Sequence, residues 1–150
     1  MDKGVGVAVI INCRNQFLFA LRDDDSAYPN TWCFPGGKIE STDESPETAT
    51  RREVKEETNV YIPSYIKALE TFILNRYDHV FHVFIYRYDP SFDLTYKLIP
   101  LDGTKDVKWV DAQDLLGSGY PVNELNQIII SELVSKKYIN PLLEKSLSGE

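Results

Sequence analysis

The sequence predicts an α/β fold in which a mixed β-sheet is covered by helices on both faces. The chain has 150 residues, of which 43% are apolar, and this suits a compact domain with a substantial core. Strand-like and helix-like segments follow one another in the order β-β-β-α-β-β-β-α-α, which is typical of such a layered fold. We therefore expect residues 1–150 to form a single domain.

Three strand-like segments come first. Residues 4–11 are a near-continuous apolar run rich in Val and Ile, which is typical of a buried strand. Residues 16–22 predict a second strand that pairs with the first through a short turn. After a polar loop, residues 32–39 predict a third strand, interrupted by a Pro-Gly-Gly tripeptide that favours a tight turn or a bulge.

A helix with clear end signals follows. Ser45 is a favourable N-cap, Pro46 suits the first helical position, and Glu47 lies near the positive end of the helix dipole. The helix is expected to end at Thr58. Asn59 then stands where the chain should adopt a left-handed conformation, for which Asn is the second choice after Gly.

The second half of the chain predicts further strands and two helices. Residues 65–74 and 79–88 are expected to form a hairpin, with a weaker strand at 95–99 and a short strand at 107–110. A short helix, ending near Gly117, follows the last strand. The final helix is expected over residues 123–137, where apolar residues recur at helical spacing.

Composition excludes several classes of function. The net charge of −7 repels nucleic-acid backbones, and no cluster of Lys and Arg offsets it, so we expect no binding of double-stranded nucleic acid. No apolar run approaches the roughly 18 residues that span a bilayer. The N-terminal residues lack the features of a signal peptide, and a cytoplasmic location is expected. The sequence leaves a homodimer open.

The predicted helix and the loop before it are unusually acidic. Their acidic residues are Glu40, Asp43, Glu44, Glu47, Glu53, Glu56 and Glu57. Glu53, Glu56 and Glu57 are spaced i, i+3 and i+4, so they share one helix face, where their repulsion costs a few tenths of a kcal/mol per pair. Such a face is either simply solvated, with Arg52 paired to Glu56, or a hard oxygen site for Mg²⁺ or Mn²⁺.

The residues around this helix resemble the signature of the Nudix hydrolases. That signature is Gly, five residues, Glu, seven residues, Arg-Glu, an aliphatic, any residue, Glu-Glu, any residue, Gly and an aliphatic. The matching residues are Trp32-Cys33-Phe34-Pro35-Gly36-Gly37-Lys38-Ile39-Glu40, Glu44, and Arg52-Glu53-Val54-Lys55-Glu56-Glu57-Thr58-Asn59-Val60. The resemblance implies a Nudix-type α/β/α sandwich and a Mg²⁺-dependent hydrolase of phosphoanhydrides, with Mn²⁺ as an alternative ion.

The sequence departs from the signature at two positions. Six residues, not five, separate Gly37 from Glu44. Asp43 restores the first spacing but breaks the second, so the role of Glu44 is open. Asn59 stands where the family has Gly, at modest cost for a left-handed helix end.

The resemblance also implies roles for individual residues. Metal ligands are expected at Glu53, Glu56 and Glu57. Catalytic roles are expected for Glu53, Glu56, Arg52 and Glu44, with Arg52 orienting a glutamate of the site. The general base stays open between Glu53, Glu56 and an aspartate. Asp102 and Asp106 flank the position where many family members carry a glutamate base, and each serves either as that base or as a turn residue.

The substrate is less well defined by the sequence. The segments around Phe34 and Asn123 resemble those of enzymes that clear oxidised dGTP, which implies a nucleoside triphosphate substrate. The implied substrate-binding residues are Arg22, Phe34, Gly37, Lys38 and Asn123, with the Asn123 amide reading a purine edge as both donor and acceptor. Asn123 is alternatively a plain N-cap, and Lys38 an exposed loop residue.

Other substrates and another class of function stay open. ADP-ribose, other nucleotide sugars, dinucleoside polyphosphates and capped RNA are alternatives within the enzyme class. A catalytically silent nucleotide-binding module is the alternative of another class, although such a module has no need of three crowded carboxylates.

Overall fold

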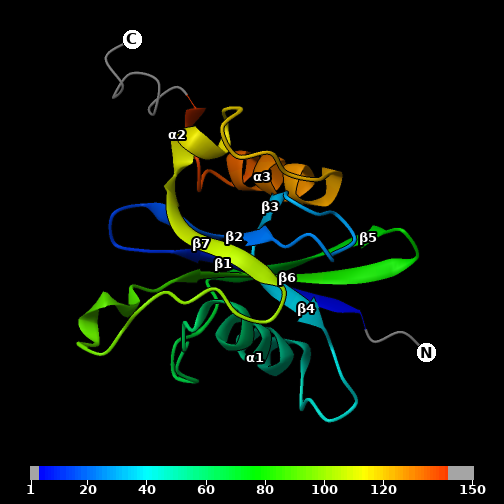
Figure 1. Cartoon of the computed structure of the whole chain (residues 1–150), viewed down its shortest axis with the longest axis vertical. Helices are drawn as coiled ribbons and strands as arrows, with labels where there is room; N and C mark the ends of the chain where they lie inside the picture. The colour runs from blue at the N-terminus through cyan, green and yellow to red at the C-terminus, as the bar shows by residue number, and fades with distance from the viewer. Residues whose placement is uncertain (1–3, 142–150) are drawn as a thin grey trace.

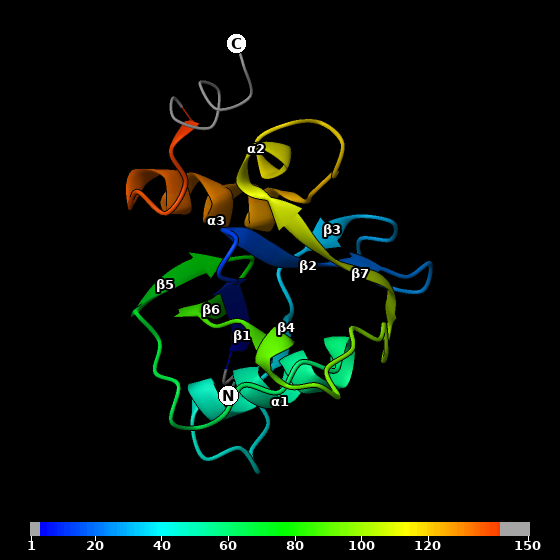
Figure 2. The same ribbon diagram turned by 90° about the vertical axis from the view of Figure 1, so that its left-hand side faces the viewer.

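A computed structural model describes residues 4–141 and shows a mixed β-sheet between helices (Figure 1). The strands are β1 (Val5–Ile11), β2 (Gln16–Arg22), β3 (Trp32–Cys33), β4 (Gly36–Lys38), β5 (Glu70–Arg76), β6 (His79–Arg87) and β7 (Thr104–Asp111). Helix α1 (Pro46–Thr58) covers one face, and α2 (Ala112–Leu115) and α3 (Glu124–Ser135) lie on the other (Figure 2). The predicted fold class is confirmed. The ends of the predicted 1–150 domain lie outside the described residues.

Strands β1 and β6 run parallel at the centre of the sheet. Antiparallel pairing extends it on both sides: β6 pairs with β5, and β1 pairs with both β2 and β4. Strand β2 also pairs with β7 along its whole length and with the short β3. The parallel pair at the centre explains why the first strand is apolar throughout, since such strands are buried on both faces.

Two hydrophobic clusters, one on each face, hold the helices to the sheet. Val9 and Ile11 of β1 pack on the α3 side with Ile129. Ala8 and Ile10, the alternate residues of the same strand, pack on the α1 side with Val54. Since successive side chains of a strand point to opposite faces, one apolar run serves both clusters.

The ends of α1 are formed as the sequence predicts. The Ser45 hydroxyl accepts a hydrogen bond from the backbone N–H of Thr48 at 3.1 Å, and Pro46 occupies the first turn. Asn59 has a φ of 66°, and its backbone N–H bonds to the carbonyl of Lys55. Both capping predictions are confirmed. The caps fix where the helix starts and stops, and thus where along α1 Glu53, Glu56 and Glu57 lie.

The predicted interruption of the third strand is also confirmed. Phe34 and Pro35 separate β3 from β4, and the two pieces pair with different partners, β2 and β1. The Pro35 carbonyl accepts a hydrogen bond from Ala8 at 2.9 Å. The break brings β4 across β1 and next to α1, so that the Gly-Gly pair lies beside the acidic helix.

Two strand predictions are wrong in part or in full. Residues 95–99 form no strand: a 3₁₀ turn, η1 (Pro90–Phe92), follows β6, and the backbone N–H of Ile99 bonds to the Thr58 carbonyl at 3.1 Å. The last carbonyl groups of α1 have no hydrogen-bond partner within the helix. Here one of them accepts the hydrogen bond that a neighbouring strand would otherwise accept. Strand β5 begins at Glu70 rather than residue 65, because residues 64–66 form a turn. No helix in the described part of the chain is long and apolar enough to cross a membrane.

Candidate active site

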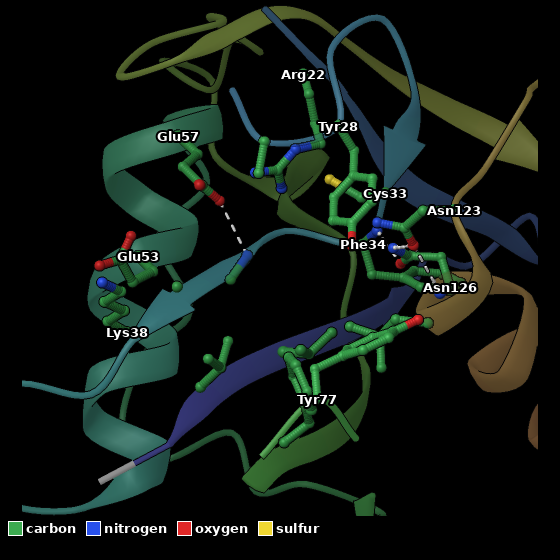
Figure 3. A pocket seen from close by; sticks show the side chains of 17 residues that line it. Arg22, Tyr28, Cys33, Phe34, Lys38, Glu53, Glu57, Tyr77, Asn123 and Asn126 are labelled. Carbon is green, nitrogen blue, oxygen red and sulfur yellow. Dashed lines mark hydrogen bonds between the residues drawn. The ribbon is translucent and has the colours of Figure 1, made fainter. Parts of the chain in front are cut away.

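A cavity of about 350 Å³ opens between α1, β4 and the N-terminus of α3. Figure 3 shows its two ends. Glu53 and Glu57 of α1 lie at one end, with Lys38 beside Glu53, while Phe34, Asn123 and the adjoining asparagine of α3 lie at the other. The cavity is therefore acidic at one end and apolar with amide groups at the other. This polarity suits a ligand that is charged at one end only.

A cluster of three carboxylates adjoins the acidic end of the cavity and shares Glu53 with its lining. One carboxylate oxygen from each of Glu53, Glu56 and Asp102 lies within 4.8 Å of the other two. Asp102 comes from the loop before β7 and has a φ of 45°, a conformation that Asp tolerates better than most residues. The backbone N–H of Leu101 bonds to the Glu57 carbonyl at 3.0 Å and so fixes this loop against the end of α1.

Glu57 points inward from the same helix. Its Oε1 accepts a hydrogen bond from the backbone N–H of Gly36 at 2.9 Å. Burial raises the pKa of Glu57 to about 8, although the Gly36 N–H opposes that shift. Burial also raises the pKa of Glu53. Both carboxylates are thus in an environment that disfavours their charged form unless a cation lies nearby.

Gly37 gives Glu53 its place against the sheet. A Cβ at Gly37 would lie 2.4 Å from the carboxyl carbon and from Oε2 of Glu53, closer than any real contact of that kind. Any larger residue would push the Glu53 carboxylate away from β4. The sequence predicts that Gly37 binds substrate. The structure adds that its lack of a side chain leaves room for the Glu53 carboxylate.

Arg52 lies at the rim of this cluster and donates hydrogen bonds to three carboxylates and to the backbone carbonyl of Lys38. It forms a bidentate pair with Asp43, through Nε at 3.0 Å and Nη2 at 2.9 Å. Its Nη1 donates to Glu53 at 3.0 Å and to Glu56 at 3.2 Å. These hydrogen bonds raise the pKa of Arg52, and the bond with Asp43 has the largest effect. Arg52 therefore contacts two glutamates, whereas the resemblance implies that it orients one.

Asp43, rather than Glu44, contacts Arg52. The Asp43 side chain is only 5% exposed, whereas Glu44 is exposed and lies outside the network around Arg52. The loop has one residue more than the signature, and Asp43 rather than Glu44 takes the position next to Arg52. Asp43 is the acid that is separated from Gly37 by the five residues of the signature. The structure does not bring Glu44, expected to be catalytic, into the cluster.

The donor set fits a hard divalent cation. Carboxylate oxygens are the ligands that Mg²⁺ and Mn²⁺ prefer, and they converge here from one helix face and one loop. Glu53, Glu56 and Asp102 would hold such an ion, with Glu57 adjoining. Asp106, the other aspartate considered from the sequence, instead pairs with Lys108 at 3.9 Å. The contribution of Asp102 could be suspected from sequence but not distinguished from a turn residue.

The opposite end of the cavity is built around two asparagines. Asn123 caps α3 by accepting a hydrogen bond from the Asn126 backbone N–H at 3.0 Å, so the N-cap interpretation is confirmed, and it also lines the cavity. The Asn126 side chain, 4% exposed, accepts from the backbone N–H of Phe34 at 3.1 Å. Sequence reasoning missed Asn126. The signal was a polar residue on the apolar face of the last helix.

The remaining predicted site residues line the same cavity. Arg22 lies on its wall, where its Nε donates to the Ser26 hydroxyl at 3.3 Å, and the exposed Lys38 lies near Glu53. Tyr28 and Tyr77, half exposed and not expected from the sequence, add aromatic surface from a loop and from the β5–β6 turn. The cavity thus gathers residues from most of the described chain.

The family of the chain follows from comparison with known proteins. The NUDIX domain family matches residues 2–128. A curated relative, "Putative hydrolase 111R" of Invertebrate iridescent virus 3, is 29% identical over 106 residues, covering 70% of this chain. This chain spans only 57% of that relative's length.

Solved structures share the fold at low sequence identity. The MutT protein from Methanosarcina mazei Go1 is 19% identical with a TM-score of 0.64, covering 89% of this chain and 92% of that one. The NUDIX domain of Shewanella oneidensis NrtR, solved with ADP ribose, is 24% identical with a TM-score of 0.63, covering 88% and 86%. Since the family match extends over most of the sequence, the chain belongs to the Nudix hydrolase family.

Proposed function

We propose that this protein is a divalent-metal-dependent hydrolase that converts a nucleoside triphosphate to the nucleoside monophosphate and pyrophosphate. The observation that carries this proposal is the polarity of one cavity, with carboxylates at one end and an apolar, amide-lined end opposite. A triphosphate bound to cations fits the first end, and a nucleobase fits the second.

The acidic end supplies the chemistry. Glu53, Glu56 and Asp102 would hold Mg²⁺ or Mn²⁺, with Glu57 beside them. When bound, the ion neutralises phosphate charge and lowers the pKa of water. Arg52 fixes the two outer glutamates through hydrogen bonds of 3.0 and 3.2 Å, so that the carboxylates keep their positions as charge develops on the substrate.

Positive groups of the protein complement the ion along the cavity. Arg22 and Lys38 both line the cavity, and each can pair with phosphate oxygens that the ion does not reach. An acidic protein of net charge −7 needs such groups to bind a polyanion. Burial raises the pKa of the Glu53 carboxylate, and a cation bound beside it would favour the ionised form.

The amide-lined end would hold the base. Phe34 is buried beneath it, and Tyr28 and Tyr77 offer exposed aromatic faces at the cavity wall. Aromatic surfaces stack on any nucleobase, whereas the amide of Asn123 can distinguish one edge from another. These groups support a nucleotide rather than a bare polyphosphate as substrate.

A substrate panel tests the proposal. Purified protein with Mg²⁺ is incubated with the common nucleoside triphosphates, 8-oxo-dGTP, ADP-ribose, a dinucleoside polyphosphate and capped RNA, and the products are separated. Release of monophosphate and pyrophosphate from a triphosphate is expected. Preferred cleavage of ADP-ribose, a dinucleotide or capped RNA would replace the proposed substrate class, and binding without turnover would support a silent module.

Two variants link that activity to the site. Glu53→Gln keeps the size of the side chain but removes the charge that a cation needs, and turnover should fall by at least about 100-fold. Glu44→Gln is the matched control, because Glu44 is an exposed glutamate outside the cluster. It should retain wild-type turnover. Equal losses in both variants would refute the assignment of the cluster.

A further inference from the structure

The two asparagines at the base end form a fixed chain of hydrogen bonds. The Phe34 N–H donates to Asn126 Oδ1 at 3.1 Å, and the Asn126 backbone N–H donates to Asn123 Oδ1 at 3.0 Å. The Asn126 side-chain Nδ2 also donates to Asn123 Oδ1, at 2.8 Å. Figure 3 shows these side chains together at the wall of the cavity.

This chain fixes the orientation of both amides. A backbone N–H can only donate, so the atom that faces it must be an oxygen. The Phe34 N–H thereby sets the Asn126 amide, and the Asn126 N–H sets the Asn123 amide. Turning either amide over would place two donors against each other, and for Asn126 this clash would be buried.

The orientation of the Asn123 amide decides which hydrogen-bonding groups it can present to a ligand. Its Oδ1 accepts two hydrogen bonds and so uses both lone pairs within the protein. No residue in the range 4–141 accepts a hydrogen bond from its Nδ2. Asn123 lines the cavity and therefore presents donors only, which differs from the donor-and-acceptor role that the sequence implies.

We propose that Asn126 is a positioning residue that locks Asn123 as a hydrogen-bond donor, so that the site selects a base edge made of acceptors. This inference rests on the proposed nucleotide hydrolase function. Guanine presents two neighbouring acceptors, N7 and O6, whereas adenine places an amino donor beside N7. The site therefore favours guanine nucleotides over adenine nucleotides.

The same geometry bears on oxidised bases. Oxidation of guanine at C8 places a hydrogen on N7 and turns that acceptor into a donor. A locked Asn123 gains nothing from this change, because its own acceptor is already used. Selection for 8-oxoguanine at this contact is not expected, and 8-oxo-dGTP should be cleaved no better than dGTP.

Asn123→Asp is the sharpest test of the lock. Asp remains a good N-cap and still accepts from Asn126 Nδ2, but it turns an oxygen toward the cavity in place of the amide donors. The measured quantity is the ratio of kcat/KM for dGTP to that for dATP. Wild type should favour dGTP about 5- to 150-fold, the effect of one mismatched buried hydrogen bond, and the Asp variant should lose or reverse that preference.

Two further variants separate selectivity from stability. Asn123→Ser keeps an N-cap without an amide that reaches the base, so the preference for dGTP should vanish without reversing. Asn126→Asp keeps an acceptor for the Phe34 N–H but replaces the Nδ2 donor to Asn123 Oδ1 with an oxygen, so that only the Asn126 backbone N–H still holds the Asn123 amide in its orientation. The ratio of kcat/KM for dGTP to that for dATP should fall toward one. The Tm of every variant is measured as well, so that a loss of stability is distinguished from a loss of selectivity.

The outcomes are distinct. An unchanged base ratio in Asn123→Asp, or a wild type that prefers 8-oxo-dGTP to dGTP, would overturn the inference while leaving the hydrolase function standing. Cleavage of no nucleoside triphosphate by wild type would refute the proposed function and with it this inference. Should Asn126→Asp fail to fold, the two Asn123 variants decide the matter, because both retain the helix cap.

Discussion

The buried carboxylate of Glu57 makes the stability of the metal-free protein depend on pH in a defined direction. Its pKa rises from 4.5 to about 8, with burial as the main cause. Between these values the unfolded chain loses a proton that the folded protein keeps. The folded state is therefore the one that binds more protons, and the free energy of unfolding falls as pH rises through this window.

The magnitude follows from the shift. Each pKa unit corresponds to about 1.4 kcal/mol, so roughly 3 kcal/mol is lost between pH 4.5 and pH 7. For a chain of this size that loss lowers Tm by about 6 to 12 °C. Glu57→Gln removes the titration and can still accept from the Gly36 N–H. The variant should match wild type near pH 4.5 and exceed it increasingly up to pH 8.

The assay is a series of thermal melts in EDTA across that pH range, for wild type and Glu57→Gln. The difference in Tm between the two proteins cancels the contribution of other titrating groups. A difference that stays constant with pH would refute the reasoning from burial. Turnover with Mg²⁺ should meanwhile fall by orders of magnitude in the variant, since Glu57 adjoins the carboxylates that would hold the ion.

Three further predictions concern single positions. Asn59→Val should lower the free energy of unfolding by about 1 kcal/mol or more, because a β-branched residue resists the φ of 66°, whereas Asn59→Gly should change it little; denaturant melts compare the two. Asp43→Asn should cost about 1.5 to 3 kcal/mol in the same assay, because it weakens a bidentate charged pair with Arg52. Asp102→Asn should weaken Mg²⁺ activation at least about 10-fold, read from the Mg²⁺ dependence of turnover, while Asp106→Asn serves as the control and leaves it unchanged.

Most of the fold could be predicted because its signals are local. The apolar run of β1 indicates burial on both faces, and Ser45 and Asn59 mark the ends of α1 by their own capping preferences. The prediction of a strand at residues 95–99 failed because the Ile99 N–H bonds to the Thr58 carbonyl at the end of α1 and the Tyr96 N–H bonds to Asp93 within the loop. Nothing within that segment indicates a helix carbonyl rather than a strand as its partner.

In the candidate site, too, the residues with local signals could be predicted and those placed by tertiary contacts could not. The spacing of Glu53, Glu56 and Glu57 places them on one helix face, which the sequence alone indicates. Asp102 joins the cluster only because its loop folds back against α1, and Asn126 acts through a hydrogen bond to a residue 92 positions away. Such contacts depend on tertiary packing, which spacing does not encode.

The most direct test of the account is the identity of the products formed from dGTP. Wild-type protein is incubated with dGTP and Mg²⁺, and ³¹P NMR follows the phosphorus species, with EDTA added and excess Mg²⁺ then restored. We expect dGMP and pyrophosphate in equal amounts, arrest by EDTA, and recovery with Mg²⁺. Formation of dGDP and orthophosphate, hydrolysis that EDTA leaves unaffected, or an absence of hydrolysis would contradict the proposed function.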